Sequence, residues 1–123
     1  MKAEGGRQDL RLRTKEYALR IIRLYQALPR GGGVAQVLGK QLLRSGTSVA
    51  AHDREACRAK SNLDFISKLK GAQQELDESD LWLELLADSS VLKPALVAPL
   101  REETNELLAV FVTMTNHVKQ RHQ

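Results

Sequence analysis

Residues 34–69 decide the fold, and they read VAQVLGKQLLRSGTSVAAHDREACRAKSNLDFISKL. A set of residues in the first part recurs every three or four positions, the spacing of one face of an α-helix: Val34, Leu38, Leu42, Ser45, Val49, His52 and Ala56. Ser61 is suited to cap a second helix, and Asp64 three residues on completes a capping-box-like pair. The stretch predicts an antiparallel helical hairpin around residue 60, whose first helix begins near Val34 and extends as far as Arg58.

The middle of the first of these helices is rich in small residues. They are predicted on its buried side: Gly46, Thr47, Ser48, Ala50 and Ala51. Gly39 and Gly46 each cost about 1 kcal/mol of helix stability relative to alanine. Because small residues let a neighbouring backbone approach closely, these positions predict tight packing against another helix.

The segment before the hairpin predicts a further helix, from about Asp9–Thr14 to Leu28. Its apolar residues fall on one arc at ~100° per residue: Tyr17, Ala18, Ile21, Ile22, Leu24, Tyr25 and Leu28. The charged residues are predicted on the opposite arc: Arg13, Glu16, Arg20 and Arg23. Pro29 and the run Gly31–Gly33 end this helix in a flexible turn. Residues 1–8 are predicted to form a disordered tail.

The segment after the break completes the set of helices. The third helix carries a core stripe and ends at Ser89 and Ser90; the stripe comprises Phe65, Ile66, Leu69, Ala72, Leu76, Leu83 and Leu86. A turn over 93–98 is expected next, and then a fourth helix from Pro99. A continuous helix kinked at Pro99 is the alternative. Its core residues have heptad-like spacing: Leu100, Leu107, Phe111, Met114 and Val118.

Four helices joined by short turns predict an all-α fold, an antiparallel up-and-down four-helix bundle formed by residues 9–123 as a single domain. Leucine and alanine dominate the apolar residues and only five residues are aromatic, which favours helix over strand. The chain has 123 residues, enough for one compact domain. A slim bundle has a poor ratio of surface to volume, which favours self-association.

Composition excludes several classes of protein. A single cysteine, Cys57, rules out an internal disulfide framework and suits a reducing cytosol. Lys93, Pro94 and Pro99 interrupt the longest apolar stretches, so no membrane span is expected. Residues 1–6 lack the apolar core of a signal peptide. We therefore expect a cytoplasmic protein.

The net charge of +4 divides unevenly along the chain. Residues 1–44 hold ten basic and three acidic side chains, a charge of +7, whereas residues 71–106 hold nine acidic and two basic side chains, a charge of −7. Two interpretations are open. Either the two segments pack together and neutralise each other, or a basic face stays free for phosphates.

The tests for catalytic chemistry fail. A di-iron site requires Glu-x-x-His on two helices, but His52 and Glu55 stand in the reverse order and His117 and His122 have no suitable glutamate. Gly39-Lys40 lacks the other glycine, the Ser or Thr, and the preceding strand of a P-loop. Ser48 and His52 have no third member of a triad, and Cys57 has no partner motif. We expect no enzyme, catalytic residue, metal, cofactor or small-molecule substrate.

One set of polar residues along the hairpin remains a candidate for a structural network or an assembly surface. It comprises Arg44, Ser48, His52, Glu55, Arg58, Ser61, Glu75 and Glu78, with Asp77 beside the last two. In an antiparallel hairpin around residue 60, Arg44 and Glu78 are level. A buried ion pair between them would set the register of the two helices more than it would add stability.

The segment 41–51, QLLRSGTSVAA, closely resembles the signature of a bacterial family called four helix bundle proteins. The segments 54–61, 64–69, 75–78 and 82–86 fit the same pattern, and the similarity spans roughly Thr14 to Val112. The family includes proteins encoded in intervening sequences of the large ribosomal RNA gene. It also resembles the accessory protein of diversity-generating retroelements. His52-Asp53 departs from the family pattern, which usually has Asn, often followed by Ile or Tyr.

The resemblance implies a four-helix bundle assembled as a homopentameric ring, contact of a basic surface of the oligomer with RNA or DNA, and no catalytic residues. Arg13, Arg20 and Arg23 are predicted to supply phosphate contacts. Further cations are expected to help them: Arg11, Lys15, Arg30 and Lys40. The alternative is a purely structural or protein-interaction oligomer, in which the basic first helix pairs with the acidic third helix within or between subunits.

Overall fold

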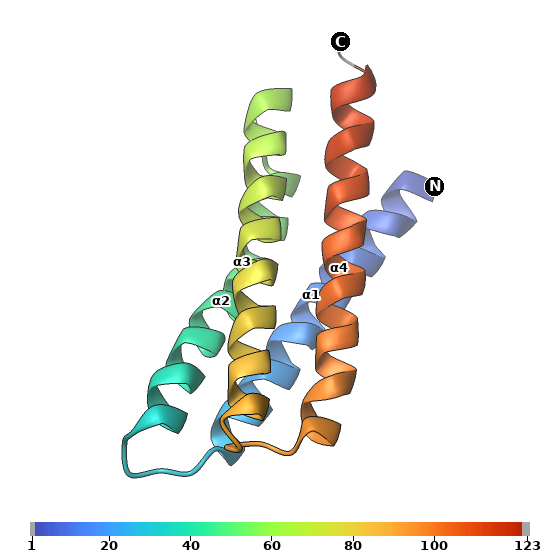
Figure 1. Cartoon of the computed structure of the whole chain (residues 1–123). Helices are drawn as coiled ribbons and strands as arrows, with labels where there is room; N and C mark the ends of the chain where they lie inside the picture. Colours follow the sequence, from blue (N-terminus) through green and yellow to red (C-terminus); the bar gives the residue numbers. More distant parts are fainter. Residues whose placement is uncertain (1, 122–123) are drawn as a thin grey trace.

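The computed structural model describes residues 2–121, with side chains described from Asp9 onward, and this part of the chain forms four helices. They are α1 (Lys2–Ala27), α2 (Val34–Cys57), α3 (Asn62–Asp88) and α4 (Pro94–Arg121). Figure 1 shows that successive helices run in opposite directions, with α1 inclined to the others and crossing behind α4. The predicted all-α, antiparallel four-helix bundle is confirmed.

The hairpin of α2 and α3 has nearly the predicted boundaries. The hydroxyl of Ser61 accepts a hydrogen bond of 3.0 Å from the backbone N–H of Asp64, as the capping pair predicts. In a capping box the side chain of Asp64 would accept a hydrogen bond from the backbone N–H of Ser61. Here the Asp64 carboxylate instead accepts from the backbone N–H of Lys60 at 3.2 Å. Both bonds satisfy backbone donors at the turn, so the local sequence is sufficient to start α3.

The first helix begins earlier than the sequence predicts. It starts at Lys2 and not between Asp9 and Thr14, so residues 2–8, predicted as a disordered tail, are helical here; Met1 lies outside the described residues. Extending an existing helix adds a hydrogen bond for each residue ordered and avoids the cost of nucleation. The prediction from composition alone overlooked this cooperativity.

The fourth helix also begins earlier than predicted. The turn expected over 93–98 is absent, and α4 runs without interruption from Pro94 with Pro99 inside it. Pro94 occupies the first helical position, where a missing N–H costs nothing. An internal proline costs about 3 kcal/mol, but Val97 and Leu100 on either side of Pro99 are buried. Their burial offsets much of that cost, so the continuous helix left open as the alternative is the one formed.

The core runs along the bundle axis and includes residues predicted from every helix. The largest side chains that are fully buried are Tyr17, Phe111, Ile21, Leu42, Leu69, Leu76, Leu83, Leu86 and Leu107. The heptad stripe of α4 is confirmed, except that Met114 is only partly buried. Val34, predicted in the stripe of α2, is 58% exposed because it lies in the first turn, beyond the end of the core.

Tight packing at the glycines of α2 is confirmed. A Cβ atom added to Gly39 would lie 2.5 Å from Leu28 Cδ1, and one added to Gly46 would lie 2.7 Å from Ile21 Cγ1. The prediction for the other small residues is wrong in part, since Ala51 is exposed and Thr47, Ser48 and Ala50 are half-buried. Ala50 is one turn after Gly46 and shares its face, whereas Ser48 and Ala51 lie on other faces of the helix.

Candidate functional site

Four buried hydroxyl groups, one from each helix, lie in the middle of the core: Tyr17, Ser45, Ser79 and Thr104. We call them the polar layer. The hydroxyl groups of Tyr17 and Thr104 are 2.7 Å apart, as are those of Ser45 and Ser79. Burial raises the pKa of Tyr17 to about 12, although hydrogen bonds from Thr104 and Ser79 act in the opposite direction.

The polar layer is a structural feature. Thr104 also donates to the backbone carbonyl of Leu100 at 2.7 Å. No histidine, carboxylate or lysine bonds to these hydroxyl groups in the described part of the chain, so none of them has the base that a nucleophile needs. The layer joins all four helices at one level, which favours this register because any shift would leave buried hydroxyl groups without partners.

Arg13 does not lie on an outer arc as predicted. Its guanidinium donates to both carboxylate oxygens of Glu103 in α4, at 3.0 Å from Nε and 2.6 Å from Nη2, and Nη2 also donates to Glu106 at 3.1 Å. Hydrogen bonds to Glu103 raise the pKa of Arg13. Arg13 precedes the buried Tyr17 by four residues, so it borders the core and contacts α4. This charge is neutralised within the chain.

The ion pair between Arg13 and Glu103 predicts a pH dependence. Hydrogen bonds from Arg13 lower the pKa of Glu103 below its ordinary value of 4.5. A lowered pKa in the folded state stabilises the fold above the ordinary value, and this contribution is lost as the pH falls through the lowered pKa. Melting temperatures measured from pH 7 to about pH 3 should therefore show wild type more stable than Glu103→Gln at neutral pH, with the gap closing in acid. A gap that stays constant would show that the pair does not stabilise the fold.

The other predicted cations are dispersed over the basic half of the bundle. Five are exposed: Arg11, Lys15, Arg23, Arg30 and Lys40. None of these five forms an ion pair with a carboxylate among the side chains described, residues 9–121. Arg20 is half-buried near Glu103 and helps to lower the pKa of that carboxyl group. The seven residues are therefore spread over α1, the following turn and α2, and do not form a single stripe.

The predicted contact between Arg44 and Glu78 is confirmed. Arg44 Nη2 donates to Glu78 at 2.9 Å, and Nη1 donates to Glu75 at 3.5 Å. The pair is not buried as expected, because 55% of the Arg44 side chain is exposed. Exposed pairs of this kind contribute roughly 0–1 kcal/mol. Asp77, on the outer side of α3, takes no part.

The rest of the predicted polar set divides into separate local contacts. Ser48 donates to the backbone carbonyl of Arg44 at 2.7 Å, and Ser61 caps α3. His52 Nδ1 lies 3.5 Å from Glu55, too poorly aligned to form a hydrogen bond, and Glu55 is 3.6 Å from Lys68. Arg58 is exposed. The eight residues therefore form no single network.

The imidazole of His52 packs against Gly71, a contact that the sequence did not indicate. A Cβ atom at Gly71 would lie 2.7 Å from the ring. His52 is half-buried and the next residue, Asp53, is buried. The glycine inside the predicted helix α3 was the available signal, since a helical glycine often marks a close approach. This contact accommodates the His52 side chain, the first of the two residues that depart from the pattern of the family that the chain resembles.

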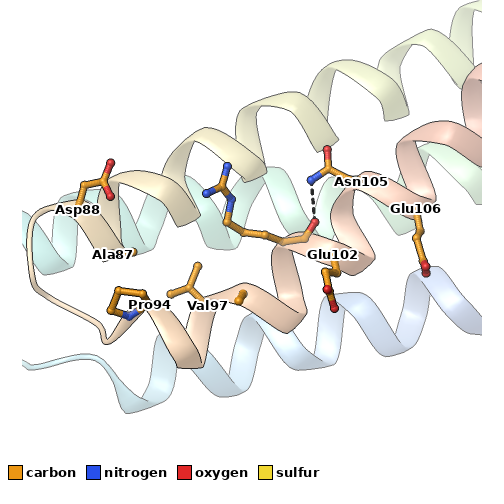
Figure 2. A pocket seen from close by; sticks show the side chains of 9 residues that line it. Ala87, Asp88, Pro94, Val97, Glu102, Asn105 and Glu106 are labelled. Carbon is orange, nitrogen blue, oxygen red and sulfur yellow. Dashed lines mark hydrogen bonds between the residues drawn. The ribbon is translucent and has the colours of Figure 1, made fainter.

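A hollow of about 620 Å³ lies on the seam between α3 and α4 (Figure 2). Arg101 lines it but donates to Asp80 at 2.9 and 3.2 Å. In Figure 2 the side chains of Glu102 and Glu106 point to the same side, and that of Asp88, at the other end of the hollow, points the opposite way. In the described part of the chain no three His, Cys, Asp or Glu side chains are close enough to hold a metal. None of its helices is both long and apolar enough to cross a membrane.

These features define a four-helix bundle of close-packed helices with a hydroxyl layer in its core. The chain matches the model of the 23S rRNA-intervening sequence protein family over residues 8–113, and it belongs to that family. A crystal structure of a protein of unknown function from the S23 ribosomal protein family of Bacteroides thetaiotaomicron has a similar fold, with a TM-score of 0.82. That protein is 33% identical in sequence, and the match covers 89% of this chain and 97% of that chain. A comparison with curated proteins finds no match.

Proposed function

We propose that this chain is a non-catalytic, homo-oligomeric helical bundle that binds RNA or DNA through phosphate contacts. The observation that supports this most is the set of five exposed cations free of carboxylate partners among the described side chains: Arg11, Lys15, Arg23, Arg30 and Lys40. The family resemblance favours five copies in a ring. The single, exposed Cys57 is in keeping with a cytoplasmic location.

Repetition around a ring multiplies a modest cationic surface. Each copy contributes the same few arginines and lysines, so a nucleic acid following the ring meets many of them at once. Stacking of bases contributes little, because Tyr17 and Phe111 are buried and Tyr25, Phe65 and Trp82 are half-buried. Binding by phosphate contacts alone is independent of sequence and releases counterions, so it weakens steeply as salt rises.

A mobility-shift titration tests this proposal. Micromolar protein should retard duplex DNA and structured RNA of unrelated sequence at ~50 mM salt, and the shift should disappear by a few hundred millimolar. Equal retardation of unrelated sequences supports phosphate recognition. The absence of any shift at ~50 mM salt would remove the nucleic-acid part of the proposal and leave the oligomeric part standing.

The acidic side of the molecule favours a second candidate, a protein-interaction module. Asp77, Glu84 and Asp88 on α3 form no ion pair with the basic side chains described, residues 9–121. Charge of both signs outside ion pairs, held on different helices, is the pattern that directs one protein surface to another.

A further inference from the structure

A groove with basic and apolar walls lies between α1 and α4, near the end of the bundle where α1 ends and α4 begins. Its volume is about 340 Å³. We call it the basic groove, and its lining residues are Arg20, Arg23, Leu24, Ala27, Leu92, Leu96 and Leu100. Leu96 is 64% exposed. No carboxylate lines the groove, and neither arginine forms an ion pair with the side chains described.

An exposed stripe on α3 has the opposite charge and the same apolar character. Leu81 is 44% exposed and Leu85, one turn on, is 37% exposed. Glu84, which is half-buried, and the exposed Asp88 are also one turn apart and lie beside them. We call these four residues the acidic stripe. Arg101, which forms its ion pair with Asp80, also interacts electrostatically with Glu84 and Asp88, but neither of these two carboxylates forms an ion pair among the side chains described. Leucines this exposed, next to such carboxylates, form a surface suited to a basic and apolar partner.

The two surfaces lie on helices whose backbones do not touch within one chain. α1 and α3 lie diagonally across the bundle, and their backbones are not in contact, because α2 and α4 lie between them. In Figure 1, α1 passes behind α3. The ion pairs that α1 forms with α4 join Arg13 to Glu103 and Glu106. No ion pair joins α1 to α3 among the side chains described, residues 9–121, so the cations of α1 are open to the α3 of a neighbouring subunit.

We propose that the acidic stripe of one copy docks in the basic groove of the next. Leu81 and Leu85 pack against the leucines of the groove, and Glu84 and Asp88 pair with Arg20 and Arg23. Both charged pairs are spaced by one helical turn, so the two sets match in length. The leucine lining favours a protein helix as the occupant of the groove, because a helix with apolar side chains would bury these leucines and a phosphate backbone would not.

Such an interface joins two different surfaces. Each copy therefore binds one neighbour through its groove and another neighbour through its stripe. A heterologous interface of this kind closes into a ring or extends as a chain. The inference rests on the self-association in the proposed function. It assigns Arg20 and Arg23 to the contact between copies and leaves Arg11, Lys15, Arg30 and Lys40 to face phosphates.

Charge exchange tests the pairing by light scattering, with the melting temperature of each variant as the check on folding. The double variant Arg20→Glu/Arg23→Glu makes the groove acidic, and Glu84→Arg/Asp88→Arg makes the stripe basic. Each alone is expected to fall to the mass of a single chain, 13.7 kDa. The chain carrying all four changes has complementary surfaces again and should regain its assembly, which a merely unfolded variant cannot do.

The matched control is Arg11→Glu/Lys15→Glu, the same change of charge on α1 outside the groove, which should leave the assembly intact. A mixture of the two double variants should also associate, in equal amounts. If Arg20→Glu/Arg23→Glu remains assembled, the oligomer stands and this interface is wrong. If the four-fold exchange stays monomeric while folded, the pairing is wrong. A monomeric wild type would overturn both the interface and the oligomer of the proposed function.

Discussion

Replacement of Tyr17 by alanine is expected to lower the free energy of unfolding by about 3–5 kcal/mol, the cost of deleting a buried aromatic ring. The side chain is fully buried, and its hydroxyl group lies 2.7 Å from that of Thr104. The change leaves a cavity and removes α1 from the polar layer. Domains of this size are stable by about 5–15 kcal/mol, so a large part of the fold's stability would disappear. Urea denaturation at a fixed protein concentration measures the effect.

Tyr17→Phe separates the hydroxyl group from the ring. It keeps the packing, and Thr104 keeps its bond to the Leu100 carbonyl, so the expected decrease is about 1 kcal/mol. A Tyr17→Ala variant as stable as wild type would mean that α1 is not an integral part of the bundle. If Tyr17→Phe were as unstable as Tyr17→Ala, most of the contribution of Tyr17 to the free energy of unfolding would come from its hydroxyl group.

Neutralisation of four exposed cations is expected to weaken nucleic-acid binding on the order of 100-fold at moderate salt. The variant replaces the following residues by glutamine: Arg11, Lys15, Arg30 and Lys40. Each phosphate contact that is lost also makes the salt dependence shallower: the negative slope of log affinity against log salt decreases in magnitude by about 0.9. Fluorescence anisotropy with labelled RNA and DNA at several salt concentrations gives both quantities.

A matched variant controls for net charge. Four exposed cations lie elsewhere on α2, α3 and the turn between them, and they are replaced by glutamine in the same way: Arg54, Arg58, Lys60 and Lys70. This control should retain most of the affinity and slope. Equal decreases in both variants would show that binding follows net charge and has no defined face. A greater decrease in the control would place the nucleic acid at the opposite end of the bundle.

The hairpin of α2 and α3 could be predicted from sequence because its signals are local. Ser61 and Asp64 start α3 within one turn, and helical periodicity alone makes Arg44 and Glu78 level. Gly39 and Gly46 also indicated their close contact correctly, since a glycine inside a helix is costly unless another backbone needs the space. In each case the determining interaction lies within a few residues or within one helix face.

The errors arose where a second helix decides the outcome. Arg13 was expected on an outer arc, but its place four residues before Tyr17 puts it beside the core, and only the position of α4 shows that Glu103 faces it. Pro99 looks like a helix start until the burial of Val97 and Leu100 is known. Exposure of Arg44 likewise depends on how closely α2 and α3 approach. Helical periodicity can be predicted from a single sequence, but the distance between two packed helices cannot.

If this chain works as one member of an assembly, its mass in solution must exceed that of a single copy. Light scattering of the purified chain at micromolar concentration and moderate salt should give a multiple of 13.7 kDa, with five copies favoured by the family resemblance. A mass of 13.7 kDa across the whole concentration range would show that the chain does not assemble. There would then be no interface between the basic groove and the acidic stripe, and the cationic surface would not be repeated.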